Sequence, residues 1–382
     1  VSEIASQTDT VLDHESSLVI TINHALEDTL AALGEDAEIG FTYTVATTGF
    51  SVTTEYGNKE ILENIPGVET VYVAPTFSIP ETSATVDLSP MTNNASTMIG
   101  ADVLNGTGYT GKGMRIAIVD TGLDLDHPSF ADAPVLTDSS LALADIEAVL
   151  DKLNAAELYP GVSAEDLYYS EKIPFAFNYV DQNLKASHDY DQQGDHGSHV
   201  AGIAAANACE GTSVIGVAPD AQVVVMKVFG ANGGAYQDDL MAAMEDALLL
   251  DVDVINMSLG ATSGFSSEDP EIDAIYGRVE YFDTILTISA GNETQSSYGN
   301  MWGTDQNPTT HPDSAVVSSP STWGGAMSIA SADNSHVLTT YLTVGNDVYA
   351  YYEALGLYTD FRSLAGEELE YVMVPGLGEE AD

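Results

Sequence analysis

The sequence is poor in cysteine, in basic residues and in long hydrophobic runs. Cys209 is the single cysteine among 382 residues, which excludes an intrachain disulfide and a cysteine-based zinc site. Nine Lys and Arg stand against 59 Asp and Glu, a formal net charge of -50, and such a surface repels phosphate backbones and anionic lipid. No apolar run approaches the roughly 18–20 residues of a membrane span. We therefore expect no nucleic-acid partner and no membrane span in this chain.

What is present is the composition of a globular protein. Apolar residues make up 44% of the chain, which is long enough for two or three domains. A polar segment, residues 1–16, shows no signal-peptide pattern and precedes a small α+β unit over 17–76. In this unit we expect strands at 18–22, 41–45, 50–52 and 68–73, and helices at 25–33 and 58–65. That order predicts a ferredoxin-like sandwich.

The rest of the chain has a different pattern. Residues 77–98, rich in Thr, Ser, Pro and Asn, are interpreted as a linker. Over 99–335 apolar strands alternate with helices, with a helical, acidic insertion at 131–170, and residues 336–382 become strand-like again. We expect strands at 114–119, 222–228, 252–257 and 284–289, and helices at 197–207 and 238–250. This alternation predicts an α/β fold, with a parallel sheet and helices on both of its faces.

Two segments carry residues suited to activating a hydroxyl nucleophile. Asp120 ends an apolar strand, where a carboxylate is either functional or caps the next turn. His196 opens a helix of small residues, and its near-neutral pKa suits a general base. His199 lacks the carboxylate of an H-E-x-x-H zinc motif and is interpreted as a packed structural histidine. His127, His188 and His311 lie in loop-like stretches and are interpreted as bystanders.

Three further segments are candidates for contacting a substrate. Asn292 follows a strand on a turn opened by glycine, and its amide suits stabilisation of an oxyanion, although such a residue alone is more often an ordinary turn asparagine. Ser258, Leu259 and Gly260 follow another buried strand and offer a bare backbone for an extended peptide. Gly233 and Gly234 are candidates for the opposing edge, and both stretches taken alone are more often plain loops.

Taken together, these segments resemble the subtilisin-like serine proteases. The matching blocks are IAIVDTG, DHGSHVAGI, GVAPDAQVVVMKV, DVINMSLG and ISAGNE, in the order of that family. The resemblance implies that Asp120 orients the base, that His196 is the general base and acid, and that Asn292 supplies the oxyanion-hole side chain. It implies further that residues 258–260 with Gly233 and Gly234 line the substrate cleft. The implied substrates are proteins or peptides.

More locally, GYTGKGMRIAIVDTGLDLDHPSF and EKIPFAFNYVD resemble the cell-envelope branch of the family, the lactocepin and C5a-peptidase-like enzymes. Many of these carry a protease-associated domain, and residues 336–382 resemble its start. Residues 17–76, with the ending IPGVETVYVAP, resemble the inhibitory propeptide, which occupies the cleft until it is cleaved off. The resemblance therefore implies a secreted or cell-wall-associated endopeptidase with its own propeptide as a partner.

The sequence also departs from the family. The nucleophile of the family lies in a Gly-Thr-Ser-Met-Ala motif, and the one Gly-Thr-Ser here, which ends at Ser213, precedes Val214 in a loop just after the His196 helix. We interpret Ser213 as a loop residue. The Asp that opens a calcium site in the subtilisins would fall near Ser129, so we assign no metal and expect no cofactor, although structural calcium stays possible.

Two hypotheses account for the missing serine. In the first, this chain is the N-terminal part of a serine endopeptidase whose serine lies beyond residue 382, so that the chain alone is inactive. In the second, the chain is a catalytically dead binding module. Against the second, Asp120, His196 and Asn292 are all in place.

Overall fold

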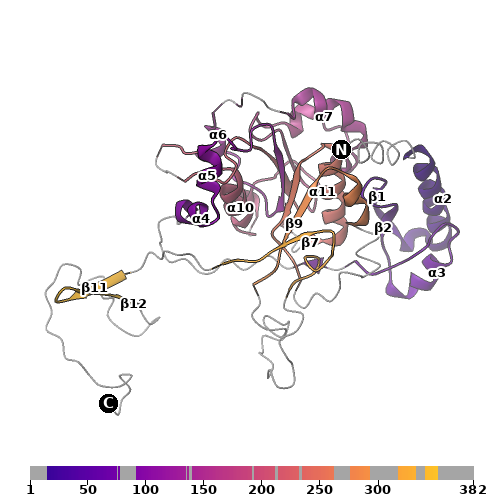
Figure 1. Ribbon diagram of the computed structural model, residues 1–382. Helices are drawn as coiled ribbons and strands as arrows, with labels where there is room; N and C mark the ends of the chain where they lie inside the picture. Colours follow the sequence, from indigo (N-terminus) through magenta and orange to yellow (C-terminus); the bar gives the residue numbers. More distant parts are fainter. Residues whose placement is uncertain are drawn as a thin grey trace, which may run out of the picture.

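Six parallel strands form one sheet at the centre of the molecule (Figure 1). The computed structural model describes residues 15–74, 76–77, 92–134, 136, 140–191, 193–210, 214–231, 235–261, 276–292, 317–332 and 340–351. Across the sheet the strands follow the order β10 (Met327–Ile329), β9 (Ile285–Ser289), β8 (Val254–Met257), β4 (Arg115–Asp120), β6 (Gln222–Lys227) and β5 (Phe175–Asn178). The predicted α/β fold is confirmed, as are the four predicted strands, whereas β5 and β10 were not predicted.

Helices cover both faces of this sheet, as predicted. α10 (His196–Ala205) lies on one face, where Ile118 packs with Ala201 and Ala205. α11 (Gln237–Leu249) lies on the other, where Val119 packs in a cluster that includes Leu240. Because successive strand residues point to opposite faces, a strand covered on both sides must be apolar throughout. This explains the unbroken apolar run at the end of which Asp120 stands.

The insertion at 131–170 is helical, as predicted. Its helices are α7 (Leu143–Val149), the 3₁₀ helix η3 (Leu150–Lys152), α8 (Asn154–Leu158) and α9 (Ala164–Leu167), and α6 (Pro128–Ala131) precedes them. Asp246 of α11 binds the first turn of α8, because its buried carboxylate accepts hydrogen bonds from Asn154 N at 2.7 Å and Ala155 N at 3.0 Å. Tyr179 donates to the same carboxylate at 2.9 Å. The insertion is thus joined to the helix that covers the sheet.

The N-terminal unit differs from the predicted ferredoxin-like sandwich. It contains α2 (Glu15–Leu33), η1 (Gly34–Asp36), an antiparallel pair of β1 (Glu38–Tyr43) and β2 (Gly49–Thr53), η2 (Tyr56–Asn58) and α3 (Lys59–Glu63). The predicted strand at 18–22 is wrong, because these residues belong to α2. Ile22, Ala25, Thr29 and Leu33 are buried at helical spacing, which outweighs the β-branched residues before them. The predicted strand at 68–73 is also wrong, since that segment pairs with no strand.

Parts of the predicted linker are ordered elements. β3 (Thr76–Phe77) pairs antiparallel with β7 (Ala235–Tyr236), and α4 (Thr92–Met98) and α5 (Ala101–Gly106) lead into the sheet. Near the C-terminus, β11 (Thr340–Val344) and β12 (Asp347–Tyr351) form an antiparallel pair, which fits the predicted strand character. The remaining short helices are η4 (His188–Tyr190) and η5 (Gly277–Tyr281). Residues 1–14, 78–91 and 352–382 lie outside the described residues.

Candidate active site

Asp120 lies at the carboxyl end of β4, and its side chain is fully buried. One carboxylate oxygen, Oδ1, accepts a hydrogen bond from Thr121 N at 2.7 Å and lies 2.8 Å from His196 Nδ1. The other oxygen, Oδ2, is buried and has no hydrogen-bond partner among the described residues. An acceptor-only carboxylate requires the imidazole to carry its proton on Nδ1. Asp120 therefore fixes both the orientation and the tautomer of His196.

His196 is the first residue of α10. Its side chain is 17% exposed, and Nε2 has no hydrogen-bond partner among the described residues. Burial lowers the pKa of His196, but the hydrogen bond that its Nδ1 donates to Asp120 and the charges of Asp120 and Asp195 outweigh this effect, so that the pKa lies above the ordinary value. The arrangement leaves Nε2 available to accept a proton from a hydroxyl group.

Two glycines allow Asp120 and His196 to approach one another. Gly122 lies two residues after Asp120 with φ of +101°, and a Cβ there would lie 2.2 Å from Ala186 O. Gly197 directly follows His196, and a Cβ there would lie 2.2 Å from Gly122 O. Thr121 joins the two segments, because its hydroxyl oxygen accepts a hydrogen bond from Gly197 N at 2.9 Å. Glycine is required at both positions by space, and at Gly122 also by the backbone angle.

The other histidines stand apart from this pair. His199 is exposed, so its interpretation as a packed residue is wrong: α10 buries Gly197, Ala201 and Ala205, and His199 lies on the opposite side of the helix. His127 caps α6, where its Nδ1 accepts a hydrogen bond from Ser129 N at 3.2 Å. His188, the first residue of η4, contacts Asp189 of the same helix and Ser198 of α10. His311 lies outside the described residues.

The strand register brings three of the candidate segments to one edge of the sheet. Val119 of β4 pairs with Met257 of β8, which in turn pairs with Ile288 of β9. β4 ends at Asp120, β8 ends just before Ser258, and β9 ends at Ser289, so the segments that follow these strands leave the sheet at the same level. Parallel sheets gather their functional loops at this edge.

The segment after β8 offers its backbone rather than its side chains. Ser258 Oγ accepts a hydrogen bond from Asn256 Nδ2 at 3.0 Å, and the Leu259 side chain is buried in the main core. A Cβ at Gly260 would lie 2.8 Å from Ser318 Cβ, so this glycine permits a close approach. Ala261 and Ser319 exchange backbone hydrogen bonds. Any ligand contact by Leu259 would have to come from its backbone.

Asn292 lies beyond β9, follows Gly291 with φ of +105°, and is exposed. It forms no hydrogen bond with another described residue. Gly233 and Gly234, like Ser213, lie outside the described residues. The strand directly after Gly234 is β7, and β3 lies against it: Thr76 pairs with Tyr236 and Phe77 with Ala235. This edge therefore holds an extended segment of the chain itself.

Two charged residues that were not singled out as candidates also reach this region. Lys227 ends β6 and is fully buried, beside Asp191 of the loop before α10. The sequence signal for Lys227 is its position at the end of a mainly apolar strand, where a charged side chain is unusual. Asp191 carried no comparable signal, because it is one of many acids in a polar loop.

Neither a metal cluster nor a membrane helix is found among the residues described. They include no group of three or more His, Cys, Asp or Glu side chains placed to bind a metal. Ser129, near which the calcium-binding Asp of the subtilisins would fall, is buried, and its hydroxyl lies 3.6 Å from Cys209 Sγ. In the same part of the chain, no helix has the length and apolar character needed to cross a bilayer.

Comparison with known proteins identifies the family. The profile of the subtilase family matches residues 111–356, the range that contains both Asp120 and His196. The chain belongs to the subtilase family, a family of serine endopeptidases.

Individual relatives agree with this assignment. The chain is 30% identical over 390 residues to a PII-type proteinase of Lacticaseibacillus paracasei, covering 99% of this chain and 19% of that protein. It is 30% identical over 352 residues to a PIII-type proteinase of Lactococcus lactis subsp. cremoris, covering 90% of this chain and 16% of that protein. Subtilisin NAT of Bacillus subtilis subsp. natto is 25% identical over 251 residues, 65% of this chain and 49% of that protein. The chain thus spans under a fifth of the length of the first two relatives.

Proposed function

We propose that this chain belongs to a secreted endopeptidase that hydrolyses peptide bonds in proteins, with His196 as its general base. The observation that carries the proposal is the Asp120–His196 pair, with its 2.8 Å contact and an imidazole Nε2 left open. The family assignment supports the same chemistry.

In the proposed reaction, Nε2 of His196 removes the proton from a serine hydroxyl as the serine oxygen attacks the peptide carbonyl carbon. The negative charge of Asp120 stabilises the imidazolium that forms. His196 then returns this proton to the leaving amine nitrogen as the carbon–nitrogen bond breaks. The amide of Asn292 donates to the oxyanion during both steps. We propose that the serine is supplied by sequence beyond residue 382.

We further propose that the N-terminal unit acts as a docked inhibitor of the same site. Glu245 of α11 supports this, because its buried carboxylate accepts hydrogen bonds from Val45 N at 2.7 Å and Ala46 N at 2.8 Å. Arg278 holds the same loop from η5 by donating to Thr44 O at 3.5 Å and Thr47 O at 3.4 Å. In Figure 1 the indigo and purple helices of the unit lie on the side of the molecule where α11 lies.

The end of the N-terminal unit leads towards the site. Phe77 is 3% exposed and belongs to the same core cluster as Ala235, the residue with which it pairs. An antiparallel backbone pairing of this kind is how an extended peptide adds to an open strand edge. The pairing therefore supports a peptide-binding edge at β7, which the unit itself occupies.

An extracellular location is part of the proposal. One relative, from Bacillus subtilis, is named the minor extracellular protease Vpr and is 31% identical over 173 residues, which cover 45% of this chain. The net charge of -50 suits a soluble protein with little affinity for anionic surfaces.

The proposal is tested by measuring hydrolysis of casein and of fluorogenic peptides by the longest protein that contains this chain. His196→Ala should lower kcat/KM by about 10³-fold or more, since the base is removed. His199→Ala is the matched control, because His199 lies exposed on the same helix. A serine-directed fluorophosphonate should label the active protein. Equal activity of the His196→Ala variant and the parent would contradict the proposal, and a complete lack of hydrolysis would favour a binding module instead.

A further inference from the structure

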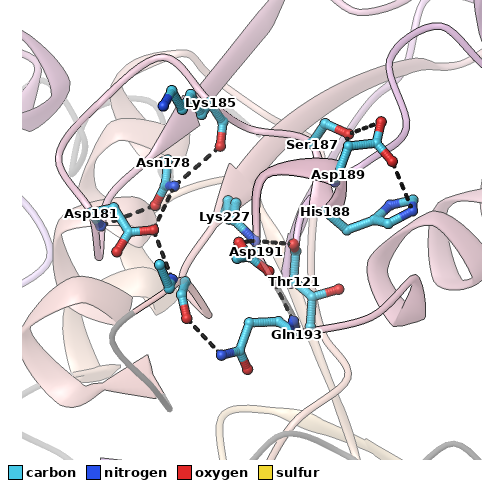
Figure 2. A network of polar contacts seen from close by, with 12 residues as sticks. Thr121, Asn178, Asp181, Lys185, Ser187, His188, Asp189, Asp191, Gln193 and Lys227 are labelled. Atoms are coloured by element: carbon cyan, nitrogen blue, oxygen red, sulfur yellow. Dashed lines mark hydrogen bonds and ion pairs between the residues drawn. The ribbon is translucent and has the colours of Figure 1, made fainter.

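Lys227 is a fully buried lysine that the proposed reaction does not use. Its ammonium group donates to the carbonyl oxygen of Thr121, the residue after the acid, and lies 2.9 Å from Asp191 Oδ2 (Figure 2). The Asp191 side chain is only 2% exposed. A buried cation and a buried carboxylate therefore lie next to the turn that follows Asp120.

The energetics of this pair do not favour it as a device for stability. Taking an ammonium and a carboxylate out of water costs several kcal/mol for each ion, and well-packed apolar side chains often serve stability equally well. Lys172, which is also buried, is held differently: it donates to Pro219 O at 2.7 Å and Ala221 O at 2.8 Å, and it forms no ion pair with a carboxylate among the described residues. The position of Lys227 therefore calls for another explanation.

Asp120 supplies that explanation. Its Oδ2 is buried and has no hydrogen-bond partner among the described residues, so one half of the carboxylate lacks local stabilisation. Asp120 and Lys227 are partners in the register of β4 and β6, which places the ammonium next to this carboxylate. Burial lowers the pKa of Lys227, whereas the hydrogen bond to Asp191 and the charges of Asp191, Asp181 and Asp120 oppose that shift. An ammonium near a buried carboxylate stabilises its ionised form.

We propose that Lys227 is a positioning residue for the Asp120–His196 pair, its ammonium group acting as the shared counter-ion of Asp120 and Asp191. The proposal rests on the function proposed above, since it assigns Lys227 to the same site. By holding Thr121 O, Lys227 fixes the turn that aims the acid. By its charge, it limits how strongly the carboxylates raise the proton affinity of His196.

The same network continues to the proposed cleft edge. Gln193 N donates to the second oxygen of Asp191 at 2.9 Å, and the Gln193 side chain donates to Gly230 O at 2.6 Å. Asp181 accepts a hydrogen bond from Ala231 N at 3.0 Å (Figure 2). Lys227 is thus linked through Asp191 and Gln193 to the backbone that leads into the segment with Gly233 and Gly234.

The test is the pKa of His196, followed by ¹H–¹⁵N NMR in the full chain. The charged groups that act on this imidazole are Asp120 and Asp195, while Asp191 and Asp181 surround Lys227. Lys227→Met removes the cation and keeps an unbranched side chain only one atom shorter, so the pKa of His196 should rise, on the order of one unit, a tenfold change in proton affinity. Asp191→Asn leaves the cation uncompensated, so the pKa of His196 should fall.

The opposite signs separate electrostatic positioning from simple loss of packing, which would move both variants in the same direction. Lys172→Met is the matched control and should leave the pKa of His196 unchanged. No shift in Lys227→Met, or shifts of equal sign in the two variants, would overturn the proposal. If Lys227→Met loses its cooperative thermal transition, the sign of the shift in Asp191→Asn decides alone. The readout needs no peptide hydrolysis, so a failed peptidase assay would not affect it.

Discussion

Glu245 is the residue whose removal tests the docking of the N-terminal unit most directly. Its carboxylate is 2% exposed and accepts hydrogen bonds from the backbone N–H groups of Val45 and Ala46, with Thr44 N at 3.2 Å. Glu245→Ala leaves these groups without an acceptor at a buried interface. Each unsatisfied buried group costs roughly 1–3 kcal/mol. Because water would bind some of these N–H groups, the total loss of docking free energy should be about 3–5 kcal/mol.

That cost should appear as easier opening of the N-terminal unit. A two-stranded sheet with a small core is marginal by itself, so an undocked unit should also unfold. With about 1.4 kcal/mol for each factor of ten, hydrogen exchange of the Phe41 and Tyr43 amides in β1 should speed up by about 10²–10⁴-fold. Exchange of the β6 amides should stay unchanged, because β6 lies in the central sheet.

Glu245→Gln is the matched control. Its amide oxygen can still accept a hydrogen bond, so exchange in β1 should rise by about tenfold or less. If Glu245→Ala changed β1 exchange by less than about threefold, the carboxylate would not be the anchor, and the interface would depend on apolar packing alone. If exchange in β6 rose equally, the variant would have destabilised the whole chain rather than the docked unit.

Three further predictions concern the same elements. Burial raises the pKa of Glu245 to about 7, although the backbone hydrogen bonds that it accepts oppose this shift, so docking of the N-terminal unit takes up a proton. The contribution of this proton uptake to the free energy of docking is full below about pH 4.5, the ordinary pKa, and is lost as the pH rises through 7. Hydrogen exchange of β1 from pH 5 to 8, corrected for intrinsic rates, should show this loss, and Glu245→Gln should abolish it. Gly197→Ala should lower the free energy of unfolding in urea by several kcal/mol, because the new Cβ would lie 2.2 Å from Gly122 O. Gly202→Ala in the same helix has open space around it and should raise the free energy of unfolding by about 0.5–1 kcal/mol. Asp246→Ala should cost about 3–5 kcal/mol in the same assay, because Asn154 N, Ala155 N and the Tyr179 hydroxyl lose their acceptor, while Tyr179→Phe should cost about 1 kcal/mol. Equal costs for Asp246→Ala and Tyr179→Phe would contradict that last assignment.

The central sheet could be predicted because its strands are covered on both faces. The run from Ile116 to Val119 is apolar without interruption, which is typical of a doubly buried parallel strand. β5 was missed although all four of its residues are buried, because a run as short as Phe175–Asn178 carries little periodicity. β10 was missed because its residues are exposed and give no burial pattern.

The N-terminal unit was predicted less well, for a physical reason. Val19, Ile20, Thr21 and Ile22 have high strand propensity, but propensity is a weak local preference. The four buried positions from Ile22 to Leu33 repeat at helical spacing, and the packing of that face decides the structure. Long-range partners matter equally at the site. Asp120 and His196 were predicted from motifs, whereas Lys227 lies in a matched block that assigns it no role, and its partner Asp191 lies in a loop outside every block.

Helix α11 explains how docking of the N-terminal unit could reach the proposed cleft. Glu245 and Asp246 are neighbours in sequence, yet Glu245 binds the N-terminal unit and Asp246 binds the helical insertion. The helix begins at Gln237, directly after the strand β7 that pairs with Thr76 and Phe77. One continuous segment therefore carries the anchor for the unit and the edge that its end occupies. Because both contacts lie on this continuous segment, loss of the Glu245 anchor should also weaken the pairing at β7.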